Sequence, residues 1–346
     1  MNTALPRYWE HPFFDRLQKG VFFAAGSIGT SILELDLGPE NFTAFQGTEK
    51  EETYLDCPEW LNVSRPEVLQ AIFRSFYEVG CDAVDACTFG ANEIVLAEFD
   101  LAPRTFELNR TAAQLVGQVR DEFSTPDHPR FSFGSIGPGT KLPSLSQTDF
   151  ETLHHSYTAQ VMGLIEGGID VLKVETCQDL LQTKVALIAI ADVFAEWGKR
   201  LPVIASVTFE ATGSMLLGSD STVPPAVLNG LDVVDLMGIN CATGPEQMVD
   251  HIRYFTAHCR RPLFVGPNAG LPEIGPGGKP IYPLSPVEFT RWQKQFVSEF
   301  GISVVGGCCG TTPQHFTAAI SALRGVKPRP RVLLGKDILT GELVAS

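Results

Sequence analysis

The sequence lacks the features that mark membrane-spanning, nucleic-acid-binding and disulfide-rich secreted proteins. No apolar run reaches the ~18 residues of a membrane span, and residues 1–10 contain no apolar signal core. The 26 Lys and Arg residues are outnumbered by 40 Asp and Glu, so the basic surface needed to bind nucleic acid is missing. Eight cysteines in 346 residues are too few for a disulfide framework. We therefore expect a soluble, cytoplasmic protein that binds neither nucleic acid nor membrane.

Short apolar runs instead alternate with longer amphipathic segments. Several of the runs are almost continuously apolar, which is typical of strands buried on both faces. The eight runs are residues 21–25, 81–89, 131–136, 170–176, 202–209, 233–241, 262–268 and 303–309. Helices are predicted at 66–79, 104–122, 149–166, 179–197, 245–258, 286–300 and 313–323, with a weak candidate at 222–229.

Eight strand and helix alternations in about 300 residues predict an α/β fold, a closed (β/α)8 TIM barrel in a single domain. An open, doubly wound sheet is the alternative, but no GxGxxG turn follows the first strand. We expect an N-terminal extension at 1–19, the barrel at 20–325 and a C-terminal tail at 326–346. A long insertion after the first strand, residues 31–64, and a Gly/Pro-rich loop at 268–285 are candidate functional loops.

Three cysteines are expected at one rim of this barrel, where active sites of the fold gather. Cys241 ends the sixth strand, and Cys308 and Cys309 end the eighth. The two strands are next-but-one neighbours, so their ends could approach within metal-ligand reach. Three thiolates with an open fourth position describe a catalytic zinc site. The alternative is that Cys308 and Cys309 form a buried or redox pair and that Cys241 only packs.

A zinc ion held by three thiolates is electron-rich and suits one reaction class in particular. It generates hydroxide poorly, but it can bind an incoming thiol, deprotonate it and present it as a nucleophile. Transfer of an alkyl group to sulfur is therefore the natural reaction, and hydrolysis is less natural.

Six segments together resemble a known family. They are TFGANEIVLAEFDL (88–101), SIGPGTKLPSL (135–145), ETCQDLLQTKVAL (175–187), GINCATGPEQM (238–248), PNAGLP (267–272) and GGCCGTTPQHF (306–316). In this order they resemble the homocysteine-binding domain of zinc-dependent homocysteine S-methyltransferases, most closely the homocysteine module of cobalamin-dependent methionine synthase. The resemblance covers roughly residues 20–325, and the paired-cysteine segment is its most specific part.

The resemblance implies a (β/α)8 barrel enzyme that transfers a methyl group to homocysteine and forms methionine. It implies Zn²⁺ on Cys241, Cys308 and Cys309, with Asn268 in the fourth position before the substrate arrives. Glu175 would hold the substrate ammonium; its alternative role is that of a carboxylate at a helix N-terminus. The substrate-binding residues expected from the resemblance are Gly26, Ser27, Glu175, Asn240 and Asn268, with the backbone N–H groups around Gly26 and Ser27 on the substrate carboxylate. No catalytic residue beyond the metal site is expected.

Two positions depart from the family pattern. Ala25 stands where the family has Asp after the first strand, and Cys87 stands where it has Asn after the second. Both positions line the substrate region in relatives, so the acceptor could be held differently or be another thiol. Cys87 is not expected to be a zinc ligand.

The methyl donor would be separate, because the sequence ends where modular methionine synthase continues into folate and cobalamin modules. Either a methyl-corrinoid protein docks on the rim, or a small donor such as a betaine or a methylsulfonium compound binds directly. The aromatic residues Phe42, Phe45, Tyr54 and Trp60 of the insertion could form a cage for a cationic donor. Their alternative role is a small core within the loop itself.

Two further readings remain open at this point. The chain could be a non-catalytic zinc- or thiol-binding subunit of a corrinoid system, as the departures at Ala25 and Cys87 would allow. It could instead be another barrel enzyme, such as an aldolase, that uses a Schiff-base lysine. Lys173 is the one lysine inside a predicted strand, and Glu175 would share its face.

Overall fold

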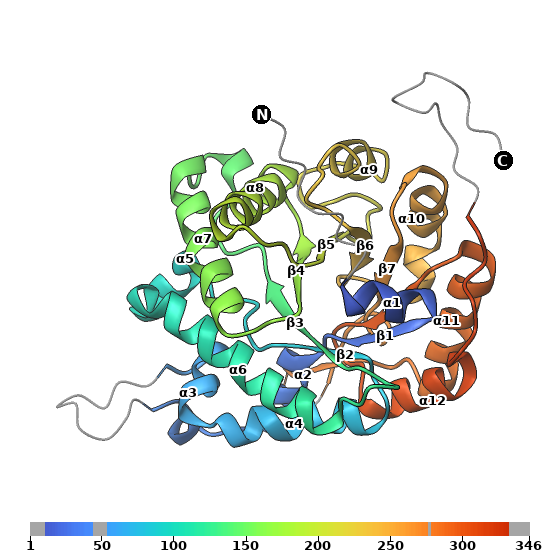
Figure 1. Ribbon diagram of the computed structural model, residues 1–346, viewed down its shortest axis with the longest axis horizontal. Helices are drawn as coiled ribbons and strands as arrows, with labels where there is room; N and C mark the ends of the chain where they lie inside the picture. The colour runs from blue at the N-terminus through green and yellow to red at the C-terminus, as the bar shows by residue number, and fades with distance from the viewer. Residues whose placement is uncertain (1–10, 44–53, 276–277, 332–346) are drawn as a thin grey trace.

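The computed structural model describes residues 11–43, 54–275 and 278–331, and its centre is a closed barrel of parallel strands. The order around the barrel is β1-β10-β7-β6-β5-β4-β3-β2, so the (β/α)8 prediction is confirmed (Figure 1). Within the described residues the eight barrel strands are β1 (Phe22–Ala25), β2 (Ala83–Asp85), β3 (Phe131–Ile136), β4 (Val171–Cys177), β5 (Val203–Val207), β6 (Leu236–Asn240), β7 (Leu263–Gly266) and β10 (Val304–Gly307).

One helix follows each barrel strand on the outside of the barrel. These helices are α4 (Pro66–Glu78), α6 (Thr105–Phe123), α7 (Phe150–Glu166), α8 (Leu180–Trp197), α9 (Val223–Leu228), α10 (Pro245–His258), α11 (Pro286–Phe300) and α12 (Pro313–Leu323). The seven longer ones match their expected ranges to within one residue at each end. Their N-termini carry the expected signals: Asp149, Asp179 and Ser285 cap α7, α8 and α11 through side-chain acceptors.

Short elements that the sequence pattern did not predict lie in the N-terminal segment, in and beside the two candidate loops, and after β2. They are α1 (Pro12–Gln18), α2 (Ile28–Glu34), α3 (Leu61–Ser64), α5 (Glu93–Leu96) and a hairpin of β8 (Glu273–Ile274) with β9 (Pro280–Ile281). Each spans seven residues or fewer, too few for a periodic pattern to stand out. The predicted second strand, 81–89, was too long, because the chain turns after Asp85 and Thr88 N–H donates to the Ala86 carbonyl.

The barrel interior is filled by an apolar layer at the amino ends of the strands. Phe13 and Phe14 of α1 close this end from outside and pack on inward-facing side chains. The ring centroid of Phe13 lies 5.1 Å from that of Phe22 and 5.8 Å from that of Phe131, in edge-to-face geometry. The barrel is therefore plugged at one end, and only the carboxyl end can hold a ligand.

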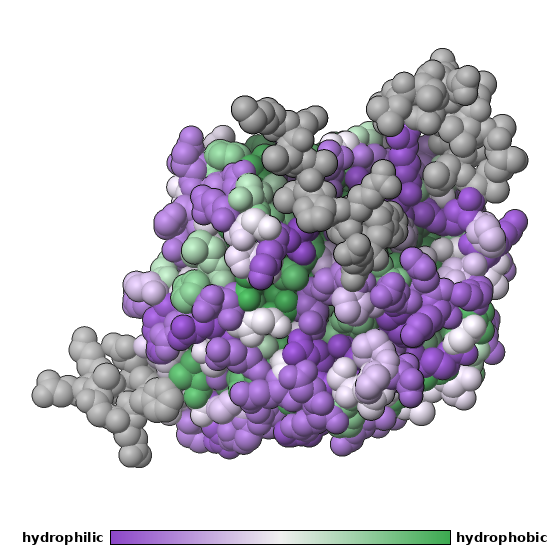
Figure 2. Space-filling model, viewed as in Figure 1, coloured by the Kyte–Doolittle hydropathy of each residue, from purple (hydrophilic) through white to green (hydrophobic). Residues whose placement is uncertain are grey.

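Hydrophilic residues predominate on the face in view in Figure 2, with apolar residues between them. Among the described residues, no helix combines the length and the apolarity needed to cross a bilayer.

A buried carboxylate, Asp82, ties the N-terminal helix to the last helix. Its oxygens accept hydrogen bonds from Arg16 Nη2 at 2.7 Å, Arg324 Nη1 at 2.8 Å and the Phe23 N–H at 2.9 Å, and His128 Nε2 lies 2.9 Å away. Burial alone would raise the pKa of Asp82, but the His128 hydrogen bond and the two guanidinium charges outweigh burial and lower it. The ionised carboxylate is therefore favoured in the folded protein.

We expect Asp82→Asn to lower the free energy of unfolding by about 3 kcal/mol or more at pH 7, because two guanidinium groups lose a buried partner. The folded pKa of Asp82 lies below the unfolded one, so its contribution is present above ~pH 4 and lost as the pH falls through the folded pKa. Urea unfolding at pH 7 and pH 3.5 measures both effects. Glu122→Gln, which breaks an exposed pair with Arg74, should change stability far less; equal losses in the two variants would contradict this account.

Candidate metal centre and active site

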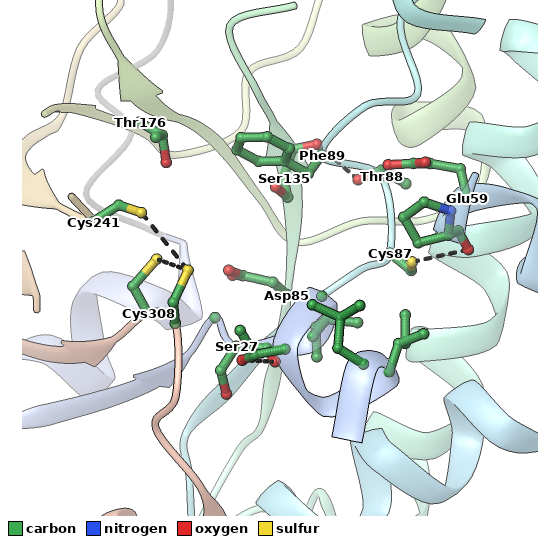
Figure 3. A pocket seen from close by; sticks show the side chains of 18 of the residues that line it. Ser27, Glu59, Asp85, Cys87, Thr88, Phe89, Ser135, Thr176, Cys241 and Cys308 are labelled. Atoms are coloured by element: carbon green, nitrogen blue, oxygen red, sulfur yellow. Dashed lines mark hydrogen bonds between the residues drawn. The ribbon is translucent and has the colours of Figure 1, made fainter. Parts of the chain in front are cut away.

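A cavity of about 560 Å³ opens at the carboxyl end of the barrel. Its wall combines the three rim cysteines with residues at or just after the carboxyl ends of β1, β2, β3 and β4. Part of the insertion and the β9 segment complete it. The polar and sulfur-bearing lining residues include Ser27, Thr30, Asp56, Glu59, Asp85, Cys87, Thr88, Ser135, Glu175, Thr176, Cys241, Tyr282, Cys308 and Cys309. Cysteine sulfurs and carboxylates thus line the same cavity (Figure 3).

The structure brings together the three cysteines that the sequence placed at the rim. The sulfurs of Cys241, Cys308 and Cys309 all lie within 4.8 Å of one another. The Cys241–Cys309 distance is 3.8 Å and the Cys308–Cys309 distance is 4.0 Å. Among the described residues this is the one group of three or more His, Cys, Asp and Glu side chains close enough to hold a metal ion.

The chain after β7 holds the two cysteine segments in place, because β7 lies between β6 and β10. The N–H of Cys241 donates to the Gly266 carbonyl and the N–H of Cys308 to the Pro267 carbonyl, both at 3.0 Å. The side-chain oxygen of Asn268 accepts from the Cys309 N–H at 3.1 Å. Cys241 has φ 64°, a left-handed conformation that non-glycine residues rarely adopt and that is often found at functional sites.

Hydrogen bonding within the cluster favours a thiolate on Cys309. The thiols of Cys241 and Cys308 lower the pKa of Cys309 to about 3, with a further contribution from the Tyr282 hydroxyl. Tyr282 can approach because its ring packs on Gly310, where any Cβ would come within 2.2 Å of the ring and where φ is +74°. The cluster is therefore prepared to present a negatively charged sulfur.

Beside the sulfurs, a buried lysine lies between two carboxylates. Lys173 Nζ is 2.6 Å from Asp85 Oδ2 and 2.8 Å from Glu175 Oε2, and it lies 5.0 Å from the centroid of the Phe264 ring. Burial alone would lower the pKa of Lys173, but the two carboxylates outweigh burial and raise it. A Schiff-base lysine needs a lowered pKa, so this arrangement speaks against the aldolase alternative.

The residues expected to bind substrate fall into two groups. Gly26, Ser27 and Glu175 line the cavity. The side chains of Asn240 and Asn268 are buried behind its wall. The Asn240 amide accepts from Ser206 Oγ at 2.7 Å and donates to Thr176 Oγ1 at 2.8 Å, so it joins the ends of β4, β5 and β6.

Sequence reasoning did not single out three residues of the site. They are Asp85, Ser135, whose hydroxyl donates to Glu175 Oε1 at 2.5 Å, and Tyr282. Asp85 and Ser135 carried a signal, since each is a polar residue within a predicted apolar strand. Tyr282 carried none, because its place depends on how the long loop folds.

Two candidate features of the cavity lie apart from the sulfurs. Cys87 lies across the cavity from the cysteine cluster, with its sulfur 3.5 Å from the Pro58 carbonyl (Figure 3). Trp60 is buried, its ring centroid 4.6 Å from that of Tyr54, and the Arg104 guanidinium lies 4.9 Å from its centroid. A protein cation already covers this tryptophan, which favours a core within the insertion over a cage; Phe45 lies outside the described residues.

We expect Lys173→Met to lower the free energy of unfolding by about 3 kcal/mol at pH 8, because two buried carboxylates lose their cation. Burial raises the pKa of Asp85 to about 7 in the folded protein, above the ~3.9 of the unfolded chain. Protonation of Asp85 should relieve the unpaired charge, so the loss should be smaller at pH 5.5. Urea unfolding of this variant and of the exposed-lysine control Lys184→Met tests it, and a pH-independent loss would contradict the charge argument.

Comparison with known proteins shows the family to which the chain belongs. A family model described as homocysteine S-methyltransferase matches residues 23–323. Methionine synthase of Mycobacterium tuberculosis is 40% identical over 327 residues, which cover 94% of this chain and 26% of that protein. Methionine synthase of Mycobacterium leprae is 40% identical over 323 residues, 93% of this chain and 26% of that protein. The chain thus spans about a quarter of the length of these curated relatives.

A solved structure agrees on the fold. The metallated form of the homocysteine methyltransferase MmuM from Escherichia coli superposes with a TM-score of 0.68 at 18% identity, covering 90% of this chain and 100% of that chain. With the family model spanning nearly the whole barrel and its three rim cysteines, the chain belongs to the homocysteine S-methyltransferase family.

Proposed function

We propose that this chain transfers a methyl group from a separate donor to the thiol of homocysteine and so forms methionine, with Zn²⁺ held by Cys241, Cys308 and Cys309. The observation that carries the proposal is the convergence of three sulfurs from two distant segments in the wall of a cavity. Membership of the homocysteine S-methyltransferase family supports the acceptor and the reaction class.

The geometry of the sulfurs fits zinc. Three sulfurs bound at 2.3 Å to one tetrahedral ion lie about 3.8 Å apart. The Cys241–Cys309 and Cys308–Cys309 sulfur separations, 3.8 and 4.0 Å, are close to this spacing. Three protein ligands leave one position for a substrate. Asn268 Oδ1 uses one lone pair on the Cys309 N–H and has a second available, so the residue suits a role as a ligand in the absence of substrate.

Zinc, when bound, supplies a Lewis acid that favours the ionised form of a thiol. The chain's own residues do the remaining work. Glu175 offers a carboxylate to the substrate ammonium, and Ser135 and Lys173 hold that carboxylate in place at 2.5 and 2.8 Å. Backbone N–H groups around Gly26 and Ser27, which line the cavity, are proposed to bind the substrate carboxylate.

The reaction then needs the acceptor sulfur to reach the donor's methyl carbon. A new sulfur–carbon bond forms, the donor leaves with the electron pair of its methyl bond, and the thiol proton passes to solvent. The cavity mouth must therefore admit the donor, which is either a small molecule or a separate methyl-corrinoid protein.

A zinc-loading experiment tests the metal site. The protein should bind about one zinc per chain, and Cys308→Ser should lose most of it because a hydroxyl is a poor zinc ligand. Zinc is measured by atomic absorption after exhaustive dialysis. Cys259→Ala removes a buried thiol at the end of α10, outside the cavity, and should keep its zinc. Equal zinc contents in the two variants would refute the assignment of Cys308.

A donor panel tests the reaction. Zinc-loaded protein is offered homocysteine with methylcobalamin-loaded protein, a betaine, a methylsulfonium compound or methylated folate, and methionine is quantified. At least one donor should give methionine, with a rate at least about 100-fold lower in Cys308→Ser, the size of effect expected for loss of nucleophile activation. Full activity of metal-free protein would disprove the proposal, and thiol binding without transfer would favour a non-catalytic thiol-binding subunit.

A further inference from the structure

In the part of the cavity wall formed by Asp85, Glu175 and Lys173, carboxylates outnumber ammonium groups by one. Asp85 and Glu175 both line the cavity, whereas Lys173 lies behind them and is only 2% exposed. With all three groups ionised, two carboxylates and one ammonium leave a net charge of −1. A buried net charge is unfavourable unless a counter-charge approaches it. With both carboxylates ionised, this part of the wall is therefore suited to a monovalent cation from the cavity side.

The hydrogen bonds of the two carboxylates show which of them has an oxygen without a partner. Glu175 accepts from Ser135 on Oε1 and pairs with Lys173 on Oε2, and Asn240 Nδ2 lies 3.4 Å from the same Oε2. Asp85 is satisfied on Oδ2 by Lys173. Its other oxygen, Oδ1, is buried and has no hydrogen-bond partner among the described residues.

A buried carboxylate oxygen without a hydrogen-bond donor costs free energy. A donor on a bound ligand would remove this cost. The Asp85 side chain is 4% exposed and extends into the cavity on the side of Cys308 and Ser27 (Figure 3). A cationic group in the cavity can therefore reach it while the thiol of the same molecule lies at the sulfur cluster.

The end of β1 lacks a carboxylate, so the cavity wall depends on Asp85 for a negative charge at this place. Ala25 closes β1 and brings no carboxylate to the wall. The next residue, Gly26, packs against the Asp85 carboxylate of the neighbouring strand. A Cβ built on Gly26 would lie 2.6 Å from Asp85 Oδ2. Asp85 on β2 thus presents its charge where β1 offers none.

We propose that Asp85 Oδ1 accepts a hydrogen bond from the ammonium group of the acceptor thiol, and that Asp85 thereby makes the site select thiols that carry an amino group. This proposal rests on the proposed function and deepens it. Lys173 acts as a positioning residue: it engages Oδ2, which fixes the carboxylate so that Oδ1 remains for the substrate. Binding of one ammonium brings the net charge of the wall to zero.

Calorimetry with two thiols tests the proposal on zinc-loaded protein. The first is homocysteine, and the second is 4-mercaptobutanoate, which has the same chain and carboxylate but no amino group. Wild-type protein should bind homocysteine at least about 10-fold more tightly, the lower end of what a charged hydrogen bond contributes. Equal affinities in the wild type would overturn the proposal without any variant.

The variant Asp85→Asn keeps the size of the side chain and removes its charge. It should weaken homocysteine binding by about 10- to 100-fold and change 4-mercaptobutanoate binding by less than about 3-fold. Asp235→Asn is the matched control, since Asp235 is also a buried carboxylate on a basic partner, Arg200, but lies outside the cavity. It should leave both affinities unchanged.

Each outcome has a defined meaning. Equal losses for both thiols in Asp85→Asn would assign Asp85 a purely structural role, and no loss for either would show that Asp85 does not contact the ligand; both overturn the proposal. Zinc content and urea unfolding show whether the variant is folded. If the proposed function itself is wrong, wild-type protein binds neither thiol, a result distinct from binding without discrimination, and the proposal falls with it.

Discussion

The two-residue period of a parallel strand in a closed barrel governs where every group of the site lies. Alternate side chains face the interior, so each strand contributes successive residues to successive layers. On β4 these are Val171, then Lys173, then Glu175, and on β2 they are Ala83 and Asp85. Phenylalanines of β1 and β3 and of α1 fill the lower layer, so the polar residues above it form the floor and wall of the cavity.

Pairing makes this polar layer tolerable in the interior. A lone buried lysine would be very unfavourable, but Lys173 has a carboxylate on each side and an aromatic ring within reach. The sulfur cluster solves the same problem by sharing protons among thiols, which lowers the pKa of Cys309. At the opposite end of the barrel Asp82 is satisfied by two arginines. In these three places, partners from several segments converge on the buried charge.

Much of the fold followed from local patterns. Apolar runs and amphipathic segments indicated the barrel and its eight outer helices, α9 only as a weak candidate, because strand and helix periods are properties of neighbouring residues. The rim cysteines were recognisable since strand ends in a parallel barrel meet at one face. The plug helix α1 and the β8–β9 hairpin escaped prediction. Each is short, and each is held by long-range packing, as when Phe13 packs on Phe22 or Tyr282 on Gly310.

By itself the sequence determined the order of strands and helices along the chain and the residue types at each strand end. It also determined the family to which the motifs point. Only the tertiary structure decided that Cys241 reaches Cys309, that Lys173 faces inward between Asp85 and Glu175, and that one oxygen of Asp85 is left without a partner. The physical reason is that a hydrogen bond or an ion pair depends on distances of a few ångströms between residues 60 to 90 positions apart. Closure of the barrel sets those distances, and no local pattern encodes them.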